Sequence, residues 1–167
     1  MAFQSAVNIN QAFGVVGELI QDEPIRAETL LIGASGFTVG YAGCKSNSTN
    51  VATMGGTVGA GVLFAGILVN PKTYASGGTA SAPLAPTMTL PANSQGEFLT
   101  FGTVVVAITG AANIGDQVQY HTTTGALSCV APGAAASASN ALIPNATVYR
   151  FPTAASGLIA IRLTGTN

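Results

Sequence analysis

The stretch Ile114–Val130, IGDQVQYHTTTGALSCV, decides the fold class of this chain. Polar and apolar residues alternate over Gln117–His121, which is the pattern of a strand with one buried face. Thr122–Gly125 then turns the chain, and Gly125 can adopt the positive φ that such turns need. Ala126–Val130 returns as the partner strand. The stretch therefore predicts a β-hairpin.

Short apolar runs separated by turn residues recur on both sides of this hairpin, as they do in barrels and sandwiches. They predict further strands at residues 25–32, 37–41, 63–69, 87–90, 98–101, 103–108, 147–151 and 158–163. Loops are expected at residues 44–61, 72–86 and 132–140. We expect an all-β fold, a single β-barrel or jelly-roll-like sandwich domain of about eight to ten strands with an extended N-terminal arm.

The expected division is an N-terminal arm, residues 1–24, and a single β domain, residues 25–167. The arm carries apolar side chains interleaved with Asn and Gln, without the period of a strand or a helix. Left in water, such a segment would expose apolar surface at a cost of about 25 cal/mol per Å². We expect it to lie against another surface through these candidate partner-binding residues: Phe3, Val7, Ile9, Phe13, Val15 and Val16. The alternative is that the arm is an ordinary first strand of the domain.

Charge is scarce, at 7% of residues with a net charge of −1, against about 25% in a typical globular domain. A surface with so little charge repels neighbours weakly, which suits a subunit that packs against other proteins. Nucleic acid is not an expected partner, because phosphate binding needs clustered cations. A membrane is not expected either, because no apolar run approaches the roughly 20 residues of a spanning helix. The N-terminus has no signal-peptide pattern, so we expect synthesis in a cytoplasm, where Cys44 and Cys129 favour free thiols over a disulfide.

Residues for catalysis or metal binding are few. His121 is the only histidine, no Gly-x-Ser-x-Gly elbow occurs, and the turn beside His121 favours a surface or interface position for it. Cys44, Cys129 and His121 lack the close spacing of a zinc site. The glycine-rich run 55–61 lacks the Gly-Lys-Ser/Thr ending of a phosphate loop, and it is interpreted as a mobile loop entering a strand.

Paired carboxylates could serve a glycosidase, but a sugar site also needs aromatic platforms. The chain has no Trp and only four Tyr. We therefore expect no catalytic residues, no cofactor and no metal. Four of the acidic residues fall near the first strand and are interpreted as a solvated or interface edge: Glu18, Asp22, Glu23 and Glu28.

Several phrases of the sequence resemble the structural cement (decoration) proteins of tailed bacteriophage capsids. They are residues 1–5, 14–18, 64–72, 90–93, 96–99, 112–116 and 123–127. The resemblance implies a non-enzymatic β protein that self-associates, as a dimer or a trimer, on the outer surface of the mature virion. It also implies that the protein bridges neighbouring subunits of the major capsid protein and stabilises the head.

Two other functions remain open at this point. One is a small glycan- or receptor-binding module of a phage tail or adhesin, which predicts an exposed aromatic cluster. The other is a small hydrolase centred on His121, which predicts an acidic residue beside that imidazole.

Overall fold

The computed structural model describes residues 14–70 and 89–165, and their regular structure is entirely β. The all-β prediction is therefore confirmed. The described chain forms twelve strands, more than the expected number, because short strands add to the long ones. Their bounds are β1 Leu19–Ile20, β2 Arg26–Ile32, β3 Phe37–Thr38, β4 Ala42–Ser46, β5 Val51–Met54, β6 Val62–Leu68, β7 Thr89–Leu90, β8 Gln95–Thr109, β9 Gln117–His121, β10 Leu127–Val130, β11 Asn140–Arg150 and β12 Gly157–Thr164.

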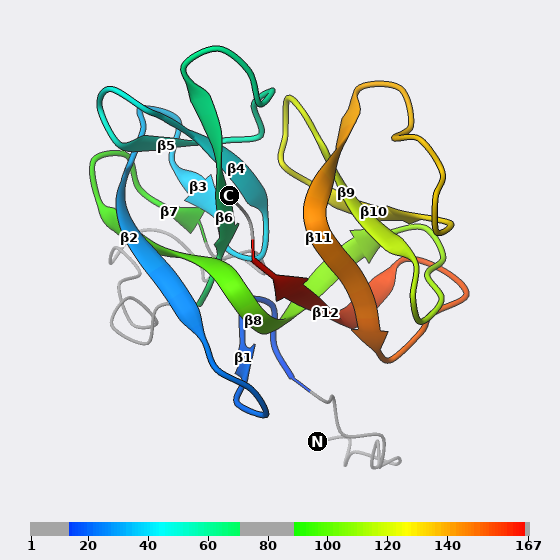
Figure 1. Cartoon of the computed structure of the whole chain (residues 1–167). Coiled ribbons are helices and arrows are strands. Elements are labelled where there is room, and N and C mark those ends of the chain that lie inside the picture. Colours follow the sequence, from blue (N-terminus) through cyan, green and yellow to red (C-terminus); the bar gives the residue numbers. More distant parts are fainter. Residues whose placement is uncertain (1–13, 71–88, 166–167) are drawn as a thin grey trace, which may run out of the picture.

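The sheet closes on itself twice, and both closures use β8. The path β8-β2-β5-β4-β6 returns to β8 through the β8–β6 pairing, and we call it the first ring. The path β8-β12-β11-β9-β10 returns to β8 through the β10–β8 pairing, and we call it the second ring. In Figure 1 the two rings lie side by side, with β8 running from one into the other. Closure leaves few strand edges on which another chain could pair.

The predicted strands at 98–101 and 103–108 are one continuous strand of 15 residues. Gly102, which separates them in the sequence, lies inside the strand with a φ of 125°. Glycine adopts such a φ at little steric cost. The part of β8 from Gln95 to Phe101 pairs with β2, and the part from Phe101 to Ile108 pairs with β12.

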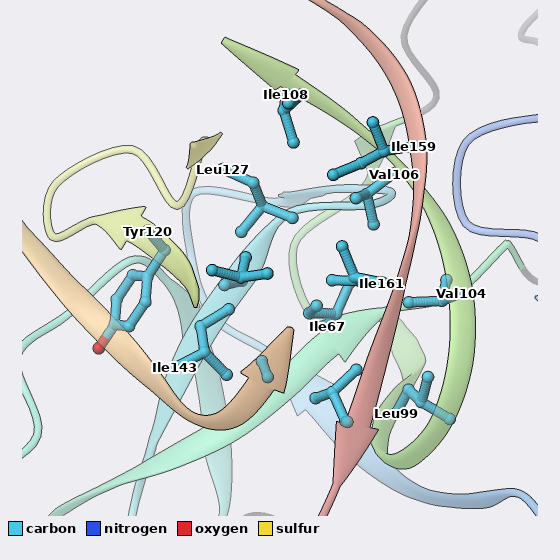
Figure 2. Close-up of a cluster of buried hydrophobic side chains, with 14 of the residues drawn as sticks. Ile67, Leu99, Val104, Val106, Ile108, Tyr120, Leu127, Ile143, Ile159 and Ile161 are labelled. Atoms are coloured by element: carbon cyan, nitrogen blue, oxygen red, sulfur yellow. The ribbon is translucent and has the colours of Figure 1, made fainter. Parts of the chain in front are cut away.

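Two buried clusters fill the rings. One lines the second ring and includes Val106, Leu127 and Ile161, as Figure 2 shows. The other lies within the first ring and includes Leu30 and Phe98. Strand β6 separates the clusters, which explains why its apolar run has both faces buried.

The hairpin predicted at 117–130 is confirmed, with Leu127 opposite Tyr120 and Val130 opposite Gln117. The loop predicted at 44–61 is wrong in part, because β4 and β5 form there and pair with each other. Their Ser, Thr and Gly content hid them, and tertiary pairing overrode weak local propensity. Strand β11 begins seven residues earlier than the predicted 147, because the register shift between Leu142 and Thr147 accommodates Pro144.

The β9–β10 turn packs against the start of the glycine-rich run that resembled a phosphate loop. The Gly56 N–H donates to the Thr122 carbonyl at 2.6 Å, and a Cβ on Gly55 would lie 2.5 Å from that same oxygen. From the other side, the Ala42 N–H donates to the Gly125 carbonyl at 3.0 Å. The start of this run therefore joins the rings rather than forming a loop in solvent. None of the described segments forms an apolar helix of membrane-spanning length.

Candidate partner-binding surface

Residues 15–18 form a tight turn at the start of the described chain. The Glu18 N–H donates to the Val15 carbonyl at 3.0 Å, and the Glu18 carboxylate accepts the Val15 N–H at 2.9 Å. Gly17 has a φ of 81°, which a turn of this kind needs at its third residue. The turn therefore closes through both its backbone and its own side chain.

This turn is docked on the body of the protein. The Gly17 N–H donates to the Val105 carbonyl at 2.8 Å, and the Gly17 carbonyl accepts the Asn70 N–H at 2.9 Å. Val16 packs against the core of the first ring, close to Gly40, where a Cβ would lie 2.2 Å from a Val16 methyl carbon. The turn that directly follows Gly14 is therefore held on the body of the protein.

Strand β1 continues this docking along β8. Leu19 pairs with Val104 and Ile20 with Thr103, on a part of β8 that lies between its pairings with β2 and β10. Residues 17–20 thus complete an edge of β8 that neither ring covers.

Two acidic residues then tie the chain to the outside of the second ring. Asp22 forms an ion pair with Arg150 at 2.7 Å. Glu23 accepts hydrogen bonds from the Thr103 hydroxyl and from Arg162 Nε, whose nearest carboxylate oxygen is 3.0 Å away. The Arg162 guanidinium in turn stacks over the Tyr149 ring at 3.7 Å from its centroid. The edge of acidic residues expected near the first strand is therefore partly an internal contact.

The structure places the predicted partner-binding residues in three situations. Phe3, Val7, Ile9 and Phe13 lie outside the described residues. Val15 is 57% exposed and points away from the core, whereas Val16 is packed inward. Sequence reasoning placed Glu23 on an acidic edge but did not connect it with Tyr149 or Arg162, which lie far from it along the chain. Only the unusual run Gln-Asp-Glu-Pro at 21–24 marked the place.

His121 has a structural partner set. Its Nδ1 accepts the N–H groups of Thr123 at 3.2 Å and Thr124 at 3.3 Å, which caps the β9–β10 turn. No hydrogen bond or ion pair with a carboxylate is seen for it among the described residues, so the arrangement of a hydrolytic triad is not assembled there. His121 therefore stabilises the β9–β10 turn, which packs against the first ring.

Both cysteines are free, which confirms the sequence expectation. Cys44 lies in the core 3.4 Å from the Tyr120 hydroxyl, and burial raises the pKa of its thiol. Burial also raises the pKa of Cys129 to about 12, with the negative charge of Asp116 adding to the effect. Protonated thiols are poor nucleophiles and poor ligands. The described residues contain no group of three or more His, Cys, Asp or Glu able to hold a metal ion.

The described tyrosines do not gather into an exposed aromatic platform. Tyr120 is fully buried, Tyr41 packs against the first-ring core, and Tyr149 is covered by Arg162. This part of the chain therefore lacks the cluster that a glycan-binding module would need.

One comparison with known proteins identifies a family, and another finds a similar fold. The family model described as "Structural cement protein (E217 gp24/Pam3 gp6)" matches residues 3–164. A chain from the solved structure "The capsid of Myoviridae Phage XM1" is similar in fold, with a TM-score of 0.68 and 14% sequence identity over 100% of both chains. No curated protein sequence matches.

Proposed function

This chain belongs to the phage structural cement protein family, and we propose that it binds the outer surface of the phage head, bridges neighbouring subunits of the major capsid protein and stabilises the mature capsid. The family is structural, so the chain is a virion component rather than an enzyme. Its partners in this proposal are the major capsid protein and further copies of itself.

The observation that carries the bridging role is the sharing of β8 by both rings. A bridge must hold two subunits at a constant separation, and a hinge between its halves would let them drift apart. Here one strand belongs to both rings, and β6 contributes side chains to both cores. The body therefore supports two contact surfaces on one rigid frame, and many copies on a shell gain from multivalency.

Residues 1–13 are the attachment element in this proposal, with Phe3, Val7, Ile9 and Phe13 as apolar anchors beside exposed Val15. Support comes from the way Gly14 is held, because the docked turn at 15–18 gives the segment a fixed origin. Thirteen residues in extended form reach at most about 45 Å, far enough to cross onto a neighbouring subunit. The segment contains no charged residue, which suits an apolar contact.

The test is a deletion of residues 2–13, with binding measured on mature capsids that lack the protein. A larger deletion to residue 20 would also remove the Val16 packing and the β1 pairing, so it would confuse folding with attachment. We expect the shortened protein to keep its strand spectrum and a cooperative melt but to lose capsid binding. Normal binding by a folded deletion variant would rule out residues 1–13 as the attachment element.

A matched variant keeps the length of the segment and removes only its apolar character: Phe3, Val7, Ile9 and Phe13 all changed to Ser. It should behave as the deletion does if apolar contact drives binding. Sedimentation of the free proteins shows at the same time whether the segment also contributes to a dimer or trimer.

A further inference from the structure

Four of the chain's eleven charged residues gather in one place on the outside of the second ring. They are Asp22 and Glu23 from the β1–β2 connection, Arg150 from β11 and Arg162 from β12. Chance alone would rarely bring four charged residues from three separate elements together in a chain with so few charges.

Glu23 is the centre of the cluster. Its side chain is only 17% exposed, and its carboxylate accepts from the Thr103 hydroxyl and from Arg162 Nε. Hydrogen bonds to a charged group are stronger than neutral ones, and partial burial shields this pair from salt. Glu23 therefore links the connection at 21–25 to both β8 and β12.

Tyr149 holds Arg162 in the orientation that this link needs. The Arg162 guanidinium lies 3.7 Å from the Tyr149 ring centroid, and Arg150 approaches the same ring at 4.6 Å. Stacking on an aromatic face fixes the plane of a guanidinium, which Lys cannot reproduce. Arg150 also donates to the Tyr149 hydroxyl at 3.0 Å, so both arginines and the ring form one unit.

The segment that Glu23 holds is the one that carries the start of the chain. Thr103, which donates to Glu23, is also the residue with which Ile20 pairs on β8. Strand β1 has only two residues, too few to hold its place by backbone pairing alone. It is fixed on one side by the docked turn at 15–18 and on the other by Glu23.

We propose that Glu23, Arg162 and Tyr149 form a latch that holds β1 on β8 and thereby positions residues 1–13 for binding to the capsid. The inference rests on the proposed function of residues 1–13. Glu23 is a positioning residue in this scheme, acting on attachment through β1 rather than by touching the capsid. Without the latch, the turn at 15–18 alone would hold the start of the described chain on the body of the protein.

The test uses the full chain with Glu23→Gln, which keeps the size of the side chain and removes its charge. Hydrogen exchange of the free protein should accelerate about tenfold or more at the amides of residues 17–20, because hydrogen bonds to charged groups contribute most. Exchange in the β9–β10 hairpin should stay unchanged. Affinity for capsids should fall several-fold, while the melting temperature shifts little.

Two further variants separate the latch from general loss of stability. Tyr149→Leu removes the stacking platform and should reproduce the effect of Glu23→Gln, whereas Tyr149→Phe keeps the ring and should stay close to wild type. Glu28→Gln is the matched ion-pair control, because it breaks the pairing with Lys45 in the first ring. It should leave exchange at residues 17–20 unchanged.

Unchanged exchange at residues 17–20 in both Glu23→Gln and Tyr149→Leu would overturn the latch, whatever the capsid assay shows. Faster exchange with full capsid affinity, in a protein that loses binding when residues 2–13 are deleted, would overturn the positioning role alone. The deletion assay tests the proposed function without any change to the latch, so the two failures are distinguishable.

Discussion

At the scale of single residues, the junction of the two rings depends on glycines whose neighbours leave no space for a side chain. A Cβ on Gly125 would lie 2.3 Å from the Ala42 carbonyl oxygen. That oxygen is part of the backbone, so relief requires the β9–β10 turn to move away from β4. The junction is therefore sensitive to one methyl group.

We predict that Gly125→Ala lowers the free energy of unfolding by more than about 3 kcal/mol, the sum of left-handed strain and overpacking. Gly133→Ala is the matched control, since Gly133 has a similar φ of 79° but nothing within 4 Å of an added Cβ. It should cost only about 1–2 kcal/mol, the strain alone. Denaturant unfolding of both variants measures the difference, and equal losses would show that the close approach contributes nothing.

The sequence predicted which residues could bind a partner, but it did not predict which of them face the core. Val15 and Val16 belong to the same apolar pattern, yet the structure exposes one and packs the other inward. A segment without a strand or helix period carries no signal for which side chain faces the core. Neighbour contacts such as that between Val16 and Gly40 decide it.

At the scale of elements, β8 determines whether the rings behave as one body. Gly102 has a φ of 125°, and an added Cβ would lie 3.3 Å from Ile25 Cγ1. The residue lies where pairing with β2 ends and pairing with β1 and β12 takes over. A side chain at this position would strain the one strand that both rings share.

We predict that Gly102→Ala lowers the free energy of unfolding by about 2–3 kcal/mol, as expected for a residue forced into a backbone region that favours glycine. Gly157→Ala, at the start of β12 and without a positive φ, should cost less. Unfolding should remain a single transition in both variants, because β8 couples the rings. Two separate transitions, or an unaffected Gly102 variant, would contradict the idea of one shared element.

The elements that the sequence predicted best are those with a clean period. The hairpin at 117–130 and the last strand alternate clearly, and both form. Strands β4 and β5 were missed because their small and polar residues are held by pairing partners rather than by their own pattern.

At the scale of the whole molecule, the low charge of the chain predicts how attachment responds to salt. Only 7% of residues are charged, and residues 1–13 contain none. Raising salt shortens the Debye length from about 10 Å at 0.1 M to about 3 Å at 1 M, which weakens exposed ionic contacts but not apolar ones.

We therefore predict that the protein stays on capsids in molar sodium chloride at neutral pH. Sedimentation of capsids, followed by measurement of the protein in the supernatant, checks it. Sodium sulfate is an informative comparison, because it strengthens apolar burial and should retain the protein at least as well. Quantitative release by salt alone would show that ionic contacts dominate.

The sequence by itself determined the all-β class and the likeness to cement proteins, and it favoured free cysteines and a surface or interface position for His121. These follow from composition, local alternation and recognisable phrases, which need no knowledge of distant contacts. Only the tertiary structure decided that β8 closes both rings, that the start of the glycine-rich run packs against the β9–β10 turn, and that Glu23 accepts a hydrogen bond from Arg162. Each of these joins residues far apart in the chain, as Glu23 and Arg162 are, and local pattern carries no information about which distant residues will pack together.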